Sequence, residues 1–283
     1  MVNTPLTTQD HDRSRGGLAY VYPVVSRRAR GVSVGVNLNP NNACNWRCVY
    51  CQVPALVFGN APAIDLALLE RELAHQLALV QSPGWLAANA PEGSRRLNDV
   101  ALSGNGEPTS SRQLPEVLEL IARTLEAQAL LHKIKLVLIT NGSLIQLEHV
   151  QVSIRRLAEL SGEVWFKVDS ASDEGLASIN NFQGGALRQR RNLELCARAC
   201  PTWIQTCMLR VDGCEPAAKE QAAYLALIAD LAREKLPLSG VHLYSLARPS
   251  FQPEAPRLSA LEPAWLEDFA TQIRSRGVAV SVV

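Results

Sequence analysis

Three closely spaced cysteines are the residues of this chain whose type and spacing most clearly point to chemistry. Cys44, Cys48 and Cys51 form a C-x3-C-x2-C pattern in the segment NPNNACNWRCVYCQVP. Cysteine thiolates hold iron–sulfur cubes, and a complete set contains four of them. Three thiolates would leave the fourth iron with an open position where a ligand can bind. A structural zinc site usually has two close pairs of ligands, and this sequence has no second pair. The pattern therefore predicts a [4Fe–4S] cluster with one open corner.

A second segment of interest is Gly104-Asn105-Gly106-Glu107. Glycines at the end of a strand allow the backbone to approach a ligand closely, and a carboxylate accepts hydrogen bonds from an ammonium group. On its own, the segment is also an ordinary turn signal. Because it lies downstream of the cysteine motif, we interpret it as part of a ligand site.

The composition limits the class of protein. The chain has 283 residues with 47% hydrophobic content, which suffices for one large domain or two small ones. Its 28 basic and 27 acidic residues create no overall field that would draw it to nucleic acid or membrane. We expect no membrane association, because no apolar run approaches the roughly 20 residues of a spanning helix. Seven cysteines without a signal peptide indicate free thiols in a reducing cytoplasm rather than a disulfide framework.

Short apolar runs alternate with longer amphipathic stretches along most of the chain. Such an alternation predicts parallel β/α units joined by right-handed crossovers. About six units are present, fewer than the eight of a closed barrel, so we expect an α/β fold that is a partial (β/α)6, TIM-like open barrel. A doubly wound open sheet is the competing fold. The expected domains are a disordered tail over 1–16 and one barrel domain over 17–283. The expected strands are 31–38, 97–104, 133–140, 163–169, 202–211, 240–247 and 277–283, and the expected helices are 64–81, 112–128, 147–160, 186–200, 216–235 and 263–276.

Polar segments follow several of the expected strands. The cysteine loop comes after the first strand, and SGNGEPT, TNGS and DSAS come after the next three. In barrels of parallel strands the active site forms at the carboxyl ends of the strands. These segments are therefore expected to meet in one site.

The motifs resemble a known family. The cysteine pattern after the first strand, with Tyr50 just before the third cysteine, resembles the radical S-adenosylmethionine superfamily. The segments VYPVVSRRARGVSVGVNLNPNNACNWRCVYCQ and ALSGNGEPTSS are similar to the branch related to the tRNA wyosine-base synthetases. The superfamily usually has glycine at the position of Asn105, whereas this branch has asparagine there. The resemblance implies that the open iron binds S-adenosylmethionine. One electron, from an external flavodoxin or ferredoxin, then cleaves it to a 5′-deoxyadenosyl radical that abstracts hydrogen from a substrate.

The resemblance also implies roles for single residues. Glu107 and the preceding Gly104, Asn105 and Gly106 would meet the methionyl amino group. Asn141 and Asp169, at the ends of the third and fourth strands, would contact the ribose and carboxylate, and Tyr50 would pack beside the adenine. A plain turn remains the alternative for Asn141, and a helix cap remains the alternative for Asp169.

The substrate and the remaining cysteines stay open at this point. The resemblance favours a tRNA base or nucleotide, whereas the balanced charge and the lack of cysteines before Cys44 do not. Arginines at 27–30 and 188–191 could neutralise phosphates or form salt links. Other hypotheses are a non-catalytic iron–sulfur carrier or redox sensor, and a zinc-stabilised RNA-binding module. We interpret the four remaining cysteines as ordinary small buried residues rather than cluster ligands. They are Cys196, Cys200, Cys207 and Cys214.

Overall fold

The computed structural model describes residues 6–7, 13 and 17–283. Most of the tail expected to be disordered, residues 1–16, lies outside the described residues, so that expectation stays a prediction. Within it, Leu6 is buried, and its backbone N–H donates to the carbonyl of Asn89. The assignment of residues 17–283 to a single domain also stays a prediction.

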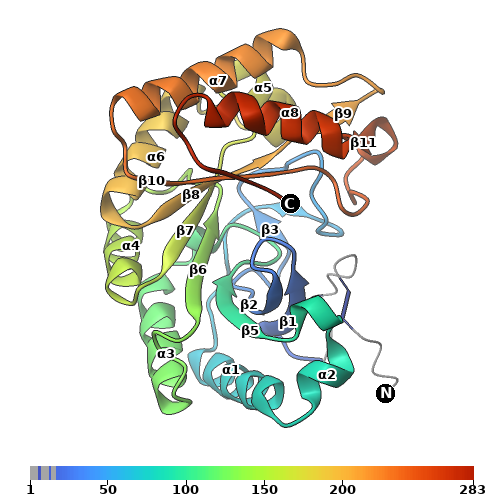
Figure 1. The fold of residues 1–283 in the computed structure, drawn as a ribbon. Helices are drawn as coiled ribbons and strands as arrows, with labels where there is room; N and C mark the ends of the chain where they lie inside the picture. The colour runs from blue at the N-terminus through green and yellow to red at the C-terminus, as the bar shows by residue number, and fades with distance from the viewer. Residues whose placement is uncertain (1–5, 8–12, 14–16) are drawn as a thin grey trace.

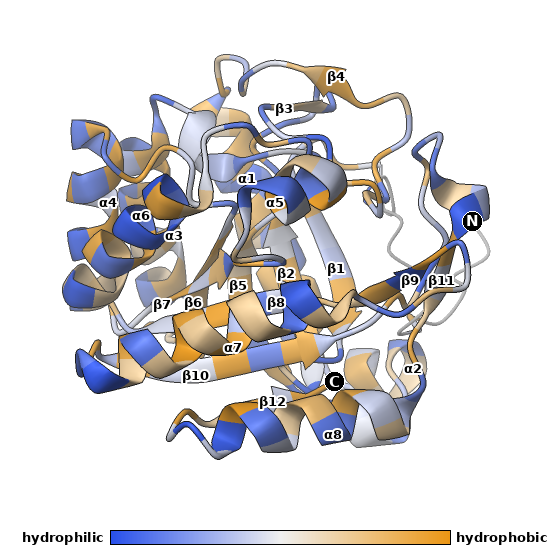
Figure 2. Cartoon of the chain, turned by 90° about the horizontal axis from the view of Figure 1, so that it is seen from above, coloured by the Kyte–Doolittle hydropathy of each residue, from blue (hydrophilic) through white to orange (hydrophobic). Residues whose placement is uncertain are grey.

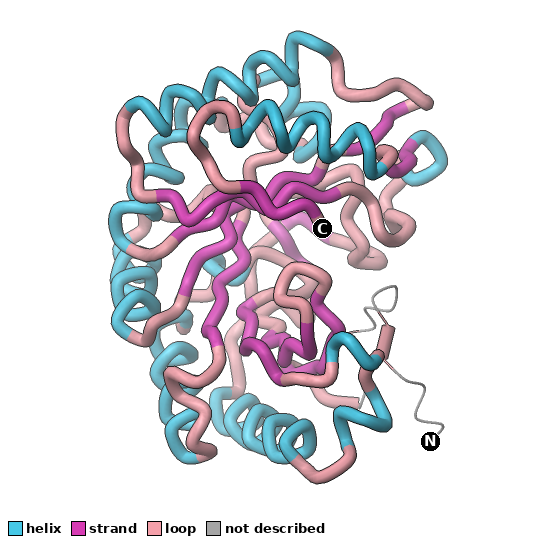
Figure 3. The backbone as a smooth tube through the Cα atoms, in the orientation of Figure 1, coloured by secondary structure: helices cyan, strands magenta, loops and turns pink. Residues whose placement is uncertain are grey.

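One curled sheet organises the structure (Figures 1 and 3). Its first strand is antiparallel to the second, and every other neighbouring pair is parallel. The first and last strands form the two edges, so the sheet does not close. In spatial order the strands are β1 (Val21–Ser26), β2 (Gly31–Val36), β5 (Leu97–Leu102), β6 (Lys135–Thr140), β7 (Glu163–Lys167), β8 (Thr202–Cys207), β10 (Leu238–Tyr244) and β12 (Val280–Val282).

Amphipathic helices cover the outer face of the sheet. In α3, buried Val117, Leu118 and Ile121 follow the three- and four-residue spacing that places side chains on one face of a helix. Figure 2 shows the helices around the sheet, each with polar and apolar residues. The covering helices are α1 (Leu66–Gln81), α3 (Leu114–Ala127), α4 (Glu148–Glu159), α6 (Ala186–Ala199), α7 (Ala218–Arg233) and α8 (Pro263–Arg274).

The expected fold is confirmed. Six β/α units and a final parallel strand form an open half-barrel rather than a doubly wound sheet. Successive side chains of each strand point to opposite faces of the sheet. In β7, Val164 and Phe166 join the core under the outer helices, whereas Trp165 and Lys167 line the inside of the half-barrel.

Several short elements were not expected from the sequence. The run 202–211 is two strands, because the chain leaves the main sheet after Cys207 and pairs elsewhere. β1 was missed altogether, although it extends the sheet by one antiparallel strand. The other additional elements are α2 (Trp85–Asn89), α5 (Asp173–Asn180), β3 (Ala43–Cys44), β4 (Val57–Phe58), β9 (Leu209–Val211), β11 (Leu258–Ala260) and the 3₁₀ turns η1 (Glu92–Ser94), η2 (Pro108–Ser110) and η3 (Ala255–Arg257).

Within the described residues, no helix has both the length and the apolar character needed to span a membrane. The expected cytoplasmic location stays a prediction.

Candidate active site inside the half-barrel

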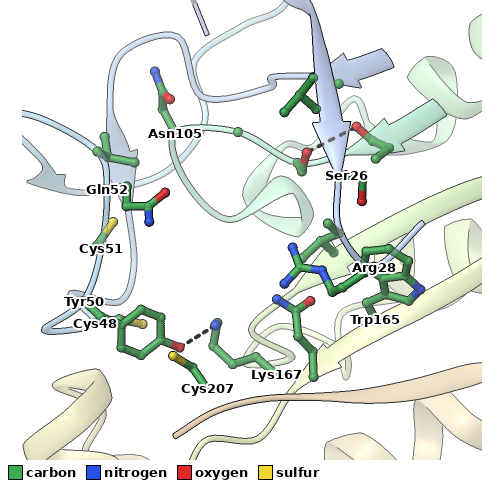
Figure 4. Close-up of a pocket in the computed structure, with 18 of the residues that line it drawn as sticks. Ser26, Arg28, Cys48, Tyr50, Cys51, Gln52, Asn105, Trp165, Lys167 and Cys207 are labelled. Atoms are coloured by element: carbon green, nitrogen blue, oxygen red, sulfur yellow. Dashed lines mark hydrogen bonds between the residues drawn. The ribbon is translucent and has the colours of Figure 1, made fainter. Parts of the chain in front are cut away.

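A cavity of about 280 Å³ occupies the inside of the half-barrel. The cysteine loop lies at the end formed by the carboxyl termini of the strands, and residues of the β1–β2 turn lie at the other end. Figure 4 shows side chains from both ends around the same space. Of the residues that the sequence predicts to hold the cluster or S-adenosylmethionine, those lining the cavity are Cys44, Cys48, Tyr50, Cys51, Gly104, Asn105, Gly106, Glu107 and Asn141.

The cysteine loop is held by contacts with distant parts of the chain. The guanidinium of Arg47 donates to both carboxylate oxygens of Glu254, at 2.8 and 2.9 Å. The backbone N–H of Val49 donates to the carbonyl of Ile179 in α5, and the hydroxyl of Ser250 donates to the carbonyl of Val49. A bidentate pair and two backbone contacts therefore fix the loop before any ligand binds.

The three thiols are partly buried in this loop. The Cys44 sulfur accepts from the backbone N–H of Trp46, and the Cys48 sulfur accepts from the side-chain amide of Asn180 at 3.3 Å. Burial raises the pKa of Cys48 to about 12 and that of Cys44 further, so both are protonated until a metal displaces the proton. Among the described residues, no group of three or more histidine, cysteine or acidic side chains converges on a single metal ion. In a cube each thiolate binds a different iron, so three sulfurs need not converge in this way.

The two glycines of the second motif are required by close packing against the cysteine loop. Gly104 has a φ of +152°, and a Cβ added there would overlap the side chain of Asn37. At Gly106 an added Cβ would overlap the carbonyl oxygen of Ala43 and the side chain of Asn39. The glycines thus let the end of β5 lie directly under the cysteine loop.

Replacing Gly106 with alanine should therefore destabilise the protein. We expect Gly106→Ala to lower the free energy of unfolding by about 1–3 kcal/mol, because overpacking moves the backbone around Ala43. The exposed Gly93, where an added Cβ would meet nothing within 4 Å, is a matched control. Gly93→Ala should change stability by less than about 0.5 kcal/mol. Urea denaturation measures both, and equal midpoints for the two variants would contradict this role of Gly106.

Glu107 joins the ends of two strands. Its side chain is buried and accepts hydrogen bonds from Thr109 (backbone N–H and hydroxyl), from the hydroxyl of Thr140 and from the backbone N–H of Asn141, at 2.6–3.0 Å. Burial raises the pKa of Glu107, and these hydrogen bonds oppose the shift, with a net rise. Among the described residues, only the Asn141 N–H donates to Oε2, so this oxygen can accept a further hydrogen bond.

The two asparagines of the predicted site connect the strand ends to the cysteine loop. The Asn141 side-chain amide donates to Asn45 at 2.8 Å, and that of Asn105 donates to Asn42 at 2.7 Å. Asn105 also accepts from Arg13 at 2.6 Å. Both asparagines line the cavity, so they position the loop and also face the space where a ligand would lie.

Asp169 lies behind the cavity wall rather than in it. Its fully buried carboxylate accepts from the hydroxyl of Tyr50 at 2.5 Å, the amide of Asn180 at 2.7 Å and the backbone N–H of Cys207 at 2.9 Å. The ammonium of Lys167 is 3.7 Å away and donates to the Tyr50 hydroxyl at 2.6 Å. These contacts leave Asp169 surrounded by protein, and a ribose contact stays a prediction.

Lys167 is a cavity residue that the sequence reasoning did not single out. Burial lowers the pKa of its ammonium, but Asp169 and other nearby groups raise it by more, so Lys167 stays protonated. Its ammonium lies 4.9 Å from the centre of the Tyr50 ring (Figure 4). The sequence pattern that could have identified Lys167 is the alternation along the expected strand in VWFKVDS. It places the side chains of Lys167 and Asp169 on the same face of the sheet.

Comparisons with known proteins agree on one family. Residues 38–215 match the profile of the Radical SAM superfamily. UPF0026 proteins of Methanocaldococcus jannaschii and Synechocystis are 31% and 29% identical over 163 and 164 residues, which is 56% of this chain in both cases. The matches cover 42% and 52% of those proteins, so the chain spans about half the length of the curated relatives it matches.

Solved structures share the fold at low sequence identity. TYW1 with a lysine–pyruvate adduct bound has a TM-score of 0.57 and 13% identity, covering 87% of this chain and 74% of that one. A radical SAM methyltransferase from Sphaerobacter thermophilus has a TM-score of 0.58 and 15% identity, covering 93% and 68%. A mutant of spore photoproduct lyase has a TM-score of 0.53 and 12% identity, covering 85% and 74%. These similarities support the half-barrel architecture.

Proposed function

Because the chain belongs to the Radical SAM superfamily, we propose that Cys44, Cys48 and Cys51 hold a [4Fe–4S] cluster with which the protein cleaves S-adenosylmethionine. The bound cluster would supply one electron to the sulfonium, giving methionine and a 5′-deoxyadenosyl radical that abstracts hydrogen from a substrate. The observation that carries the proposal is that all three thiols face one cavity together with the Gly-Asn-Gly-Glu segment and Asn141.

The chain's own residues would bind and orient S-adenosylmethionine. Glu107 Oε2, with its spare acceptor capacity, suits the methionyl ammonium beside Gly104, Asn105 and Gly106. The Lys167 ammonium, whose charge is balanced by Asp169, lines the cavity and offers a further N–H donor for a carboxylate. The Tyr50 ring would pack against the adenine, since its hydroxyl is committed to Lys167 and Asp169. We infer that Asp169 positions Tyr50 and Lys167.

The electron would come from an external reduced flavodoxin or ferredoxin, as the resemblance to the family implies. The RNA or nucleotide substrate implied by the same resemblance stays a prediction. TYW1 was solved with a lysine–pyruvate adduct, which requires an amine that can act as a nucleophile. Among the described residues, Lys167 is the lysine that lines this cavity, and it is protonated and donates to the Tyr50 hydroxyl. A protonated amine is not a nucleophile, which argues against that chemistry here.

The test is reductive cleavage by the reconstituted protein. The full chain would be purified without oxygen, loaded with iron and sulfide, reduced with dithionite and incubated with S-adenosylmethionine. We expect 5′-deoxyadenosine and methionine in equal amounts. A fully loaded, reduced protein that forms no 5′-deoxyadenosine would refute the proposal.

A non-catalytic iron–sulfur carrier is the second candidate, because a fourth cysteine, Cys207, lines the same cavity as the first three. Burial raises the pKa of Cys207, and the nearby Asp169 and Cys48 raise it further. Four cysteine ligands would close the cluster and leave no iron for S-adenosylmethionine.

Removal of this fourth thiol separates the two candidates. We expect Cys207→Ala to keep its iron content and to cleave S-adenosylmethionine within about a factor of three of the unaltered chain, less than 1 kcal/mol in barrier. A carrier would instead lose iron in this variant. Iron analysis and the EPR spectrum, recorded with and without S-adenosylmethionine, provide the measurement. Addition of S-adenosylmethionine should change the spectrum in the enzyme and leave it unchanged in the carrier.

A further inference from the structure

At the end of the cavity opposite the cysteine loop, three polar side chains that the proposed function does not use have buried atoms without a described hydrogen-bond partner. Arg28 comes from the turn between β1 and β2, Asp99 from β5 and Gln205 from β8, and all three line the cavity. We call this group the arginine subsite. Arg28 lies just before the first residue of β2, and the cysteine loop lies after the last residue of the same strand. The arginine subsite and the cysteine loop are therefore at opposite ends of the barrel interior.

Arg28 is held by aromatic rings and not by an acid. Its guanidinium carbon lies 5.2 Å from the centre of the Trp165 ring and 5.0 Å from that of Tyr244. Within the described part of the chain it forms no ion pair with a carboxylate, and its buried Nε has no hydrogen-bond partner. Rings that pack on a guanidinium leave its N–H edge free. Figure 4 shows this edge pointing into the cavity.

Asp99 and Gln205 also present unused polar atoms. Asp99 is 2% exposed, and its Oδ1 accepts from no described residue. Burial raises the pKa of Asp99 to about 7, although Ser33 and Arg28 oppose the shift. The Gln205 amide donates to the Tyr244 hydroxyl at 2.9 Å, and its Oε1 has no described partner. The Tyr244 hydroxyl can donate or accept, so the oxygen and nitrogen of the Gln205 amide can exchange places. In either orientation, one polar atom of the Gln205 side chain has no described partner.

Buried polar groups without partners are rare, since each costs about 1–3 kcal/mol. Three of them together at one end of a cavity indicate a complementary ligand. A guanidinium edge matches an oxyanion, and a neighbouring carboxylate oxygen matches an O–H or N–H donor. The cavity of about 280 Å³ also contains the proposed S-adenosylmethionine site, so only part of it is left for a substrate, which favours a small ligand over a polymer.

We propose that the arginine subsite binds the substrate and that this substrate is a small hydroxy- or amino-carboxylate. Its carboxylate would accept from Arg28, while its hydroxyl or amino group would donate to Asp99 or Gln205. The inference rests on the proposed function in identifying the bound molecule as the substrate, whereas the binding itself needs no electron and no cluster.

The test is direct binding of three matched probes, L-lactate, propionate and L-lactamide. Propionate lacks the hydroxyl donor of lactate, and lactamide lacks its charge. Isothermal titration of the full, unreduced chain at pH 8.5, where Asp99 is mostly ionised, should rank lactate as the tightest of the three. Arg28→Gln should weaken lactate binding about 10- to 100-fold, the loss of a charge-assisted hydrogen bond, and should remove the preference over lactamide. Asp99→Leu should remove the preference over propionate.

Controls make the outcome decisive. Arg198→Gln, on the exposed side of α6, should leave lactate binding unchanged. Circular dichroism checks that each variant is folded, and if Arg28→Gln is not, Arg28→Lys should still show reduced affinity because it lacks the planar fork. Equal lactate affinity in the unaltered chain and Arg28→Gln would overturn the proposal, as would binding of inorganic phosphate but not lactate. Because no reductant is present, Arg28-dependent binding would stand even if the protein failed to cleave S-adenosylmethionine.

Discussion

Alanine at Cys44, Cys48 or Cys51 is expected to abolish 5′-deoxyadenosine formation. Each thiol lines the same cavity, and the loop that carries them is fixed by contacts outside the cluster site. Loss of one thiolate from a set of three leaves one more iron of the cube without its protein ligand. We expect single variants to lose most of their iron and at least about 1,000-fold in rate, which corresponds to about 4 kcal/mol in barrier. Iron analysis and chromatography of the nucleoside products measure the two effects.

The exposed Cys214 gives the matched control for these variants. Cys214→Ala removes a thiol of the same kind from a position beyond β9, so iron content and nucleoside formation should both be unchanged. The free energy of unfolding of the three loop variants, measured without metal, should also remain close to that of the unaltered chain. Normal 5′-deoxyadenosine formation by a chain lacking Cys48 would show that the cysteine motif is not the cluster site.

The part of the site that could be predicted from the sequence is the part encoded by local spacing. Three cysteines in eight residues and a glycine-rich strand end are contiguous patterns, and the parallel strands bring them to one edge. The partners of these residues could not be predicted in the same way. Asp169 was recognised at a strand end, but its contacts with Tyr50, Asn180 and Cys207 join residues up to 119 positions apart.

The missed elements have local physical reasons. β1 contains Pro23, which argues against a central strand and is tolerated here because β1 is an edge. α5 has eight residues, and its amphipathic pattern is too short to stand out from a loop. The sequence leaves the arginines at 27–30 as candidates for phosphate contacts or salt links. The structure places Arg28 against Trp165 and Tyr244, which are more than a hundred residues away. A phosphate contact stays a prediction.

Loss of the Lys167 ammonium is expected to be the most destabilising change of charge in the site. The Asp169 side chain is fully buried and that of Lys167 is 16% exposed, so removal of the cation leaves a buried carboxylate without its counter-charge. We expect Lys167→Met to lower the free energy of unfolding by about 3–5 kcal/mol. The exposed pair of Arg123 and Glu70 is the control, and Arg123→Met should cost less than about 1 kcal/mol. Urea denaturation of the metal-free chain measures both.

A double-mutant cycle tests whether the loss of stability in Lys167→Met comes from its interaction with Asp169. If Lys167 mainly compensates Asp169, adding Asp169→Asn to Lys167→Met should restore part of the lost stability, because the buried charge is then gone. Additive losses, or a cost for Lys167→Met no greater than for Arg123→Met, would contradict this account. The cycle also bears on the cluster, since Asp169 holds Asn180, whose amide donates to the Cys48 sulfur. A charge pair behind the cavity wall thus connects the stability of the fold to the position of a cluster ligand.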